Sequence, residues 1–432
     1  MARVAAAEAA SPVQAVESAT RELALALGAE SVSFLIADLS GRCLVRLAHV
    51  GVRDPLHADG DRGVTRSERR RLGQPGESAT VVPYDRGPRE QVIRTQQVMV
   101  LAPESPDAAP LSEDSWQVLA PVTERGEVIG LLEFTMPDEP APESVDEISR
   151  LAHALAFVVI ANRRHTDLYE WGQRTRPLSL SAEIQHRLLP GPQTCEAGAF
   201  TLAGWLEPAA GIAGDTFDFN LARDVLHLSI TDAMGHGVAA ALNATLCLGS
   251  LRNARSEGAT PLEQVSAANK ALLEHAANMG LEDFVTGLIG RLDLPTASLE
   301  LVNAGHVAPY LARGSDVTPL ELPVDLPMGL FEGVDYRDSR HLLEPGDRLV
   351  LVTDGMLERN AARVDLSAAI LDTRSLHPRE AVRVIADRTL EATGHQLKDD
   401  ATMLCLDWHG HHGNLRSSAF GADTARASGP LP

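Results

Sequence analysis

The sequence is short of three things: cysteine, long apolar runs and positive charge. Four cysteines are spread over 432 residues, and no two of them form a CxxC pair: Cys43, Cys195, Cys247 and Cys405. This spacing argues against a disulfide scaffold and against a cysteine-based zinc site. It predicts reduced, mostly buried thiols in a cytoplasmic protein.

No apolar run approaches the roughly 20 residues that are needed to span a bilayer. The first twenty residues contain Glu8 and Glu17 and lack the sustained apolar stretch of a signal peptide. Lysine and arginine number 38 against 59 acidic residues, which gives a formal net charge of −21. Because an acidic surface repels phosphate backbones and anionic headgroups, we expect neither nucleic acid nor membrane as a partner.

The chain does have the length and apolar content of a globular protein with two or three domains, at 432 residues and 44% hydrophobic. Residues 12–29 predict a helix, and "SVSFLIAD" and "CLVRLAHV" predict two strands joined by the turn "LSGR". Residues 52–95 are polar and rich in turn-forming residues, so they predict long surface connections.

A helical apolar pattern runs from Ser144 to about Gln173, with Ser144 and Glu147 placed as a capping box. At about 1.5 Å per residue this predicts a rod of roughly 45 Å. Such a helix needs a partner along its length, so we expect it to pair with a second copy and form a homodimer. A short amphipathic helix, "LSLSAEIQHRLLPGP", follows and completes a helical connector over residues 166–190.

The hairpin "VLAPVTERGEVIGLLEF" and the long helix after it give residues 12–165 a resemblance to a GAF sensory domain. The resemblance implies an α/β sensor domain. A PAS domain and a generic α+β regulatory domain are the alternatives for this region.

Acidic residues recur at the ends of apolar strands in residues 191–408. They are Asp215 in "AGIAGDTFDF", Asp232 in "LSITDAMGHG", Asp354 in "LVLVTDGML", and Asp399 and Asp400 in "LKDDATMLCLDW". A buried acid is costly unless something neutralises it, and any single one has a plain explanation as a turn or cap residue. Together they predict a shared site for a divalent cation, and oxygen-only ligands favour Mg²⁺ or Mn²⁺ over Zn²⁺. In this interpretation Gly235 and Gly237 let the chain turn sharply after Asp232 into the next helix.

Six ordered segments resemble the SpoIIE-type branch of the metal-dependent PPM (PP2C-like) serine/threonine phosphatases. They are "GIAGDTFDF", "TDAMGHGVAAAL", "NAGHVAPYL", "LPMGL", "PGDRLVLVTDGMLE" and "DDATML", and the resemblance covers about residues 180–408. It implies an α-β-β-α sandwich of two antiparallel sheets, so the expected fold class of the whole chain is α+β. The chemistry agrees, because two cations can activate water and neutralise the departing phosphate, and the sequence has no nucleophilic CX5R motif.

The resemblance also implies the site. It makes Asp215 a metal ligand, directly or through water, and Asp232 the acid that bridges two Mn²⁺ or Mg²⁺ ions beside the carbonyl of Ala233. Asp354 and Asp399 are the remaining catalytic metal acids, and Asp400 is either a ligand or a residue that orients one. The implied substrate is a phosphorylated anti-anti-sigma (STAS-domain) protein, and no substrate-binding residue is identified.

Other candidates have plainer interpretations. His236 is a possible general acid, but a structural role at the helix start is favoured; His306 is expected to be a hydrogen-bonded wall residue, and Asp218 to make local hydrogen bonds. Residues 409–432 predict a disordered tail. Two rival functions remain: a non-catalytic binder of phosphoproteins on the same fold, and a metal-dependent nuclease, which the net charge disfavours.

Overall fold

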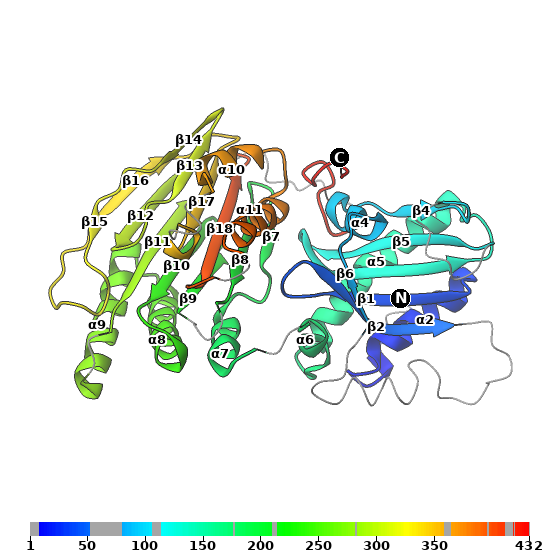
Figure 1. The fold of residues 1–432 in the computed structure, drawn as a ribbon, viewed down its shortest axis with the longest axis horizontal. Coiled ribbons are helices and arrows are strands. Elements are labelled where there is room, and N and C mark those ends of the chain that lie inside the picture. Colours follow the sequence, from blue (N-terminus) through cyan, green and yellow to red (C-terminus); the bar gives the residue numbers. More distant parts are fainter. Residues whose placement is uncertain are drawn as a thin grey trace. The chain divides into compact units, whose positions relative to one another are not determined.

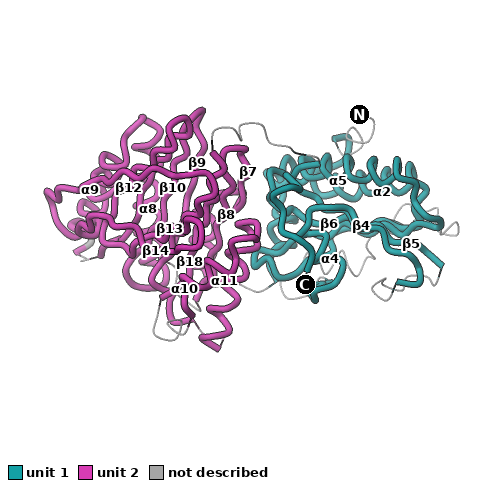
Figure 2. The backbone as a smooth tube through the Cα atoms, turned by 90° about the horizontal axis from the view of Figure 1, so that it is seen from above, with its two compact units in different colours: residues 1–177, 417–432 teal, residues 178–416 magenta. Residues whose placement is uncertain are grey.

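The computed structural model describes residues 8–51, 80–105, 114–175, 178–209, 214–280, 283–357, 364–394, 397–410, 418 and 420–431. The chain forms two compact units (Figure 2). Unit 1 comprises residues 1–177 and 417–432, and unit 2 comprises residues 178–416. The division falls inside the predicted connector. Among the described residues, no helix combines the length and the apolar character that crossing a membrane would require.

Unit 1 is built on one six-stranded antiparallel sheet with the strand order β3-β2-β1-β6-β5-β4 (Figure 1). Its strands are β1 (Ser31–Ala37), β2 (Cys43–Gly51), β3 (Val81–Pro83), β4 (Met99–Leu101), β5 (Trp116–Glu124) and β6 (Glu127–Met136). Its helices are α2 (Ala15–Leu27), α4 (Pro88–Thr95), α5 (Pro142–Asn162) and α6 (Leu168–Gly172). The predicted first helix and both predicted hairpins are confirmed. The prediction of surface connections is wrong for residues 81–95, which contain β3 and α4, while residues 52–79 lie outside the described part.

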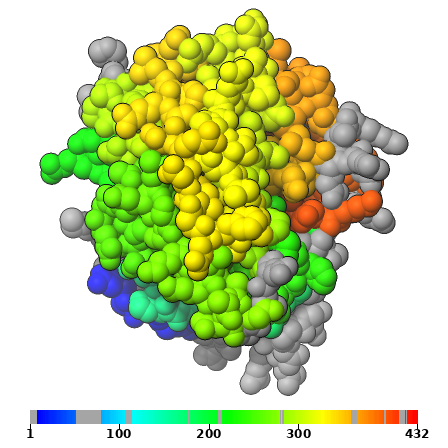
Figure 3. Space-filling model, turned by 90° about the vertical axis from the view of Figure 1, so that its left-hand side faces the viewer, coloured from blue at the N-terminus to red at the C-terminus, as the bar shows by residue number. Residues whose placement is uncertain are grey.

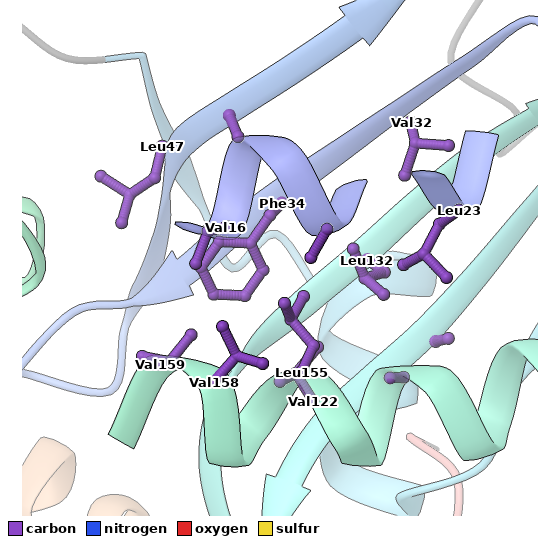
Figure 4. Close-up of a cluster of buried hydrophobic side chains, with 14 of the residues drawn as sticks. Val16, Leu23, Val32, Phe34, Leu47, Val122, Leu132, Leu155, Val158 and Val159 are labelled. Atoms are coloured by element: carbon purple, nitrogen blue, oxygen red, sulfur yellow. The ribbon is translucent and has the colours of Figure 1, made fainter. Parts of the chain in front are cut away.

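The core of unit 1 lies on the sheet face that α2 and α5 cover (Figure 4). Alternate residues of β1 point to opposite faces, as the period of a strand requires. Phe34 packs with Leu23, Leu132 and Leu155 on this face, while Leu35 belongs to a smaller cluster near α4 on the other. Helix α2, near the N-terminus, and residues 420–431, near the C-terminus, both contact elements of this sheet. Whether the unit is a GAF domain stays a prediction.

The predicted 45 Å rod is wrong. Helix α5 has 21 residues, ends at Asn162 and is followed by a separate short helix, α6. It begins at Pro142 with Ala141 in the N-cap position, so Ser144 is not its cap. Proline is well suited to the first helical position because the N–H that it lacks would have no partner there. The apolar stripe of α5 packs on the sheet of its own unit, so the predicted pairing with a second copy loses its main support and stays a prediction.

Unit 2 contains two six-stranded sheets. One has the order β15-β12-β11-β10-β9 with β16 also paired to β12, and the other has the order β14-β13-β17-β18-β8-β7. The short β12–β15 pairing is parallel and the other pairings between neighbouring strands are antiparallel. The strands are β7 (Thr194–Glu196), β8 (Phe200–Glu207), β9 (Asp215–Leu221), β10 (Val225–Ala233), β11 (Val285–Asp293), β12 (Ser298–Ala304), β13 (Tyr310–Arg313), β14 (Asp316–Pro319), β15 (Val324–Asp325), β16 (Asp338–Leu342), β17 (Arg348–Val352) and β18 (Ala401–Trp408).

Helices cover the outer face of each sheet in unit 2. They are α7 (Leu180–Leu188), α8 (Gly237–Ser256), α9 (Pro261–Met279), α10 (Leu366–Asp372) and α11 (Pro378–Ala392). Helices α8 and α9 pack on the sheet that contains β10, and α10 and α11 pack on the sheet that contains β17 (Figure 1). Between the sheets lies an apolar layer that includes Phe217, Ile230 and Leu351. The predicted four-layer sandwich is therefore the architecture of unit 2.

Residues 420–431 correct another prediction. The sequence predicts a disordered tail over 409–432, yet Ala422, Asp423 and Ser428 are buried, and this segment belongs to unit 1. The segment "GADTARASGP" consists mostly of small residues, and small residues allow it to approach the surface beneath it closely.

Close packing between the two sheets of unit 2 makes a stability prediction. A Cβ atom at Gly204 of β8 would lie 2.3 to 2.7 Å from ring atoms of Phe217, on β9 of the facing sheet. We therefore expect Gly204→Ala to lower the free energy of unfolding by roughly 1–3 kcal/mol, measured by urea denaturation. The control is Gly249→Ala in α8, where a Cβ meets no atom within 4 Å and helix propensity should add about 0.5–1 kcal/mol. Unchanged stability of Gly204→Ala would contradict the packing.

Candidate active site

Both sheets of unit 2 place acidic residues at one common end. Asp232, near the end of β10, lies opposite Asp215, the first residue of β9. In the facing sheet, Val352 at the end of β17 pairs with Met403 near the start of β18. Asp354 lies two residues after the end of β17, and Asp399 and Asp400 directly precede β18. The antiparallel order thus brings these four segments to the same edge, as the sequence predicts.

Asp215 connects the two sheets through its carboxylate. Its side chain is buried, and its Oδ2 accepts hydrogen bonds from the hydroxyls of Thr353, at 2.7 Å, and Thr402, at 2.6 Å. Burial raises the pKa of Asp215 well above its usual value, and the nearby Asp232 and Asp400 add to the rise, while the two hydroxyls oppose it. Neither threonine stands out in the sequence as a site residue. The only available signal was that each stands beside an acid, in "VTDG" and "DDAT".

Asp232 interacts with each of the other four acids of the cluster. Burial, followed by the charges of Asp354, Asp399 and Asp400, raises the pKa of Asp232 to about 7, and a hydrogen bond with Asp215 opposes the rise. A carboxylate in this environment needs either a proton or a cation to offset the neighbouring negative charge.

Asp354 and Asp399 lie at the more open side of the cluster. Asp354 begins a 3₁₀ turn (Asp354–Met356) and is exposed, and Asp399 accepts a hydrogen bond from the backbone N–H of Asp400 at 2.9 Å. Within the described residues, no three acidic, histidine or cysteine side chains already converge as a preformed metal cage.

Asp400 is held differently from the other acids. Its Oδ1 accepts from the N–H of Ala209 at 2.8 Å, and its Oδ2 accepts from the N–H of Gly214 at 3.1 Å and from Nε2 of Gln185 at 2.6 Å. Both oxygens are thus engaged in orienting the start of β9. This geometry supports the orienting role among the two that the sequence left open; metal ligation by Asp400 stays a prediction.

Gln185 brings helix α7 into the site. Its Nε2 also donates to the backbone carbonyl of Asp215 at 2.9 Å, while its buried Oε1 has no hydrogen-bond partner. The sequence pattern predicts the helix but does not single out Gln185. A polar residue on the inner face of a short amphipathic helix was the one available signal.

Two glycines allow the backbone to close around the acids. A Cβ at Gly214 would lie 2.4 Å from the carbonyl oxygen of Ala233, and a Cβ at Gly355 would lie 1.9 Å from that of Asp400. After Asp232 the chain turns through Gly235, with φ of 96°, and Gly237, with φ of 75°. The predicted glycine turn between β10 and α8 is confirmed.

The two candidate histidines have structural positions. His306 is buried, shares a 2.8 Å hydrogen bond between Nδ1 and Thr286, and lies 3.1 Å from the carbonyl of Val352 through Nε2. Burial lowers the pKa of His306 to about 4, so it is neutral near pH 7 and connects the two sheets, as expected for a wall residue. His236 is exposed and occupies the N-cap position of α8 without a side-chain capping bond.

Asp218 lies outside the acid cluster. It is buried and forms ion pairs with Arg252 at 2.8 Å and with Arg255 at 2.9 Å, both on α8. Asp218 thus has a structural role, as expected, but its hydrogen bonds are to residues 34 and 37 positions away in the sequence and are not local. These two arginines are engaged in fixing α8 to β9, so they do not provide a phosphate clamp.

The donor chemistry fits a hard divalent cation. The clustered groups are carboxylates, and an unpartnered amide oxygen lies beside them. Burial, and after it repulsion from neighbouring acids, raises the pKa values of Asp215 and Asp232. Mg²⁺ and Mn²⁺ prefer such oxygen ligands. The fit rests on the five acids together, since any one of them alone would have a structural explanation.

Comparison with known proteins agrees with this geometry. Residues 222–409 match the family model described as Stage II sporulation protein E (SpoIIE). Residues 222–409, less than half of the chain, are thus similar to the SpoIIE family. The SpoIIE match includes Asp232, Asp354, Asp399 and Asp400 but begins after Asp215.

Phosphoserine phosphatase RsbU of Bacillus subtilis is 24% identical to this chain over 268 residues, which are 59% of this chain and 79% of RsbU. Phosphoserine phosphatase RsbP of the same organism is 23% identical over 54% of this chain and 58% of RsbP. The SiaA-PP2C domain of Pseudomonas aeruginosa superposes with a TM-score of 0.45 at 21% identity, covering 53% of this chain and 93% of that domain. In RsbP the match thus spans little more than half of the relative's length.

Substitution of Gln185 tests how strongly helix α7 fixes the positions of the acids. Gln185→Ala removes the bonds to Asp400 and to the Asp215 carbonyl, and we expect Mn²⁺ activation to weaken by about 10–100-fold. Glu183→Gln is the control, because Glu183 lies on the same helix in a surface ion pair with Arg187. The measurement is the Mn²⁺ concentration for half-maximal phosphatase activity. A Gln185→Ala value within twofold of wild type would show that α7 does not position the site.

The raised pKa of Asp232 predicts how stability depends on pH. The folded protein holds the Asp232 proton up to about pH 7 and the unfolded chain only to about 3.8, so ionisation destabilises the metal-free fold as pH rises through this window. Asp232→Asn should therefore stabilise metal-free protein more at pH 7.5 than at pH 5, by roughly 1–3 kcal/mol.

The measurement is the difference in melting temperature between variant and wild type in EDTA. The difference matters because His306, whose pKa is lowered, changes wild-type stability in the opposite direction over part of the same range. A difference that shrinks or reverses between pH 5 and 7.5 would contradict the raised pKa.

Proposed function

We propose that this chain is a metal-dependent protein phosphatase that removes phosphate from serine or threonine of a regulatory protein. The observation that carries the proposal is Asp232, held at a strand end between a buried carboxylate and the charges of three further acids. The SpoIIE match and the phosphoserine phosphatase relatives support it.

Asp232 and the carbonyl of Ala233 would hold the metal between them, with Asp215, Asp354 and Asp399 completing the ligands. Two ions, Mn²⁺ or Mg²⁺, supply when bound a lowered pKa of water and positive charge for the phosphate oxygens. The protein's own residues orient the metal-binding carboxylates. The hydroxyls of Thr353 and Thr402 fix one oxygen of Asp215 and leave the other for binding.

Reaction replaces the bond between phosphorus and the serine oxygen by a bond between phosphorus and a water oxygen, and the serine oxygen takes up a proton. His306 is a poor donor of that proton, since both its ring nitrogens are engaged and it is neutral near pH 7. His236 is exposed at the start of α8, four residues after Asp232 in the sequence. Substitution of His236 can therefore test whether it acts as the general acid.

Exposed apolar residues beside the acids favour a protein substrate over a small phosphoester. Met234, Val238 and Leu242 follow Asp232 along the turn and the first turns of α8, and all three are exposed. Phe331 is also exposed, in a segment whose Met328 pairs with Val285 at the same sheet edge. In Figure 3 the surface of the chain around residue 330 is coloured yellow. Apolar patches on a monomer commonly mark protein-binding surfaces. A phosphorylated anti-anti-sigma protein with a STAS domain is the substrate that the family resemblance suggests.

The decisive variant is Asp232→Asn. The amide keeps the shape of the side chain but weakens the negative field that gathers cations, so we expect turnover of a phosphoserine protein with Mn²⁺ to fall by about 10²–10⁴-fold. The control is Asp224→Asn, in the exposed turn at the opposite end of β10. Activity within threefold of wild type would overturn the assignment of Asp232.

The same assay separates the rival functions. A non-catalytic regulator would bind the phosphoprotein without releasing phosphate at any Mn²⁺ concentration. A nuclease would release nucleotides from DNA and leave the phosphoprotein intact.

We further propose that unit 1 regulates the phosphatase. Each unit has its own apolar core, which is why residues 178–416 are expected to fold without unit 1. The turnover number of this fragment should differ from that of the full chain by at least threefold. Equal turnover across a range of Mn²⁺ concentrations would count against regulation by unit 1.

A further inference from the structure

Residues 420–431 belong to unit 1, and part of this segment is buried. Ala422 and Ser428 are each 2% exposed, and Asp423 is 3% exposed. A segment that merely lay near a surface would not bury three of its side chains. The sequence of this segment, "FGADTARASGPL", is made mostly of small residues.

Hydrogen bonds to two of its backbone carbonyls hold the segment near both ends. The N–H of Gly126, in the turn between β5 and β6, donates to the carbonyl of Gly421 at 3.1 Å. Nε of Arg94, near the end of α4, donates to the carbonyl of Gly429 at 2.7 Å. Two separate elements of unit 1 therefore recognise the main chain of the same short segment.

Between these ends the segment carries its own turn. The carboxylate of Asp423 accepts from the N–H of Ala425 at 3.2 Å and lies 3.4 Å from Nε of Arg426. The carbonyl of Asp423 also accepts from the N–H of Arg426 and from that of Ala427. A peptide that is folded locally loses less conformational freedom when it docks.

Gly421 is the most selective position. Its φ is +100°, and a Cβ there would lie 2.0 Å from the carbonyl oxygen of Thr123 and 2.6 Å from Nδ1 of His153. The surface beneath it is fixed, because His153 hydrogen-bonds to that same carbonyl and the Thr123 hydroxyl donates to Gln96 at 2.6 Å. No side chain other than that of glycine fits at this position without displacing β5 or α5.

We infer that unit 1 carries a peptide-binding site, formed by the β5–β6 turn, the end of α4 and the face of α5 at His153. Its ligand is the chain's own 420–431 segment, a glycine-led peptide with an Asp–Arg turn. The chain leaves unit 1 at residue 177 and returns to it at residue 417. Unit 2 is consequently attached to unit 1 at both of its ends, and release of the peptide leaves a single attachment.

The test is hydrogen exchange of residues 118–130 in the full chain, compared between wild type and two glycine variants. Gly421→Val should expel the segment and raise the exchange rate at the β5–β6 turn by at least tenfold. Gly429→Ala is the matched control, because its Cβ would meet no atom within 4 Å and its carbonyl remains in place. Exchange in Gly421→Val that equals wild type would overturn the docking.

A second measurement distinguishes a binding site from a permanent part of the fold. Synthetic peptide of residues 418–432, added in excess to the Gly421→Val chain, should slow exchange at the β5–β6 turn toward the wild-type rate. The same peptide with Gly421→Val should have no effect. If the wild-type peptide also fails to slow exchange at millimolar concentration, the segment is a fixed element of unit 1 and the inference is wrong.

Discussion

The hydrogen bonds from Thr353 and Thr402 to the buried carboxylate of Asp215 are the interaction on which the site depends. They join the two sheets at the edge where the other acids emerge, and they hold a negative group where burial alone would favour a proton. His306 joins the same two sheets nearby, between Thr286 and the carbonyl of Val352. The acids are therefore held close together where the two sheets meet, and a bound cation would relieve the repulsion between their carboxylates.

Sequence patterns predicted the architecture well where a residue pattern has one common structural role, such as apolar alternation in a strand or glycine in a sharp turn. The alternation of "SVSFLIAD" and the apolar run before Asp354 predicted strands, and the glycine turn after Asp232 was identified from Gly235 and Gly237. The five acids were found because a carboxylate at the end of a buried strand is unusual. Thr353, Thr402 and Gln185 were not found, since their importance comes from contacts between elements that are far apart in the sequence.

The errors had a similar physical origin. The apolar pattern of residues 144–173 is helical throughout, but the pattern does not show whether a partner is a second copy or the chain's own sheet, and α5 packs on its own sheet. Residues 420–431 were predicted to be disordered because they are small and polar. Their burial depends on the shape of the β5–β6 turn and α5, and on a glycine at position 421, which no local pattern reveals.

The central claim is that the acids around Asp232 form the metal site of the phosphatase domain, and crystals grown with Mn²⁺ test it most directly by anomalous diffraction. The account predicts two manganese peaks about 3.5–4 Å apart, with Asp232 in contact with both and Asp400 still bonded to Gln185. Manganese that binds elsewhere and leaves Asp232 without a metal contact would contradict it.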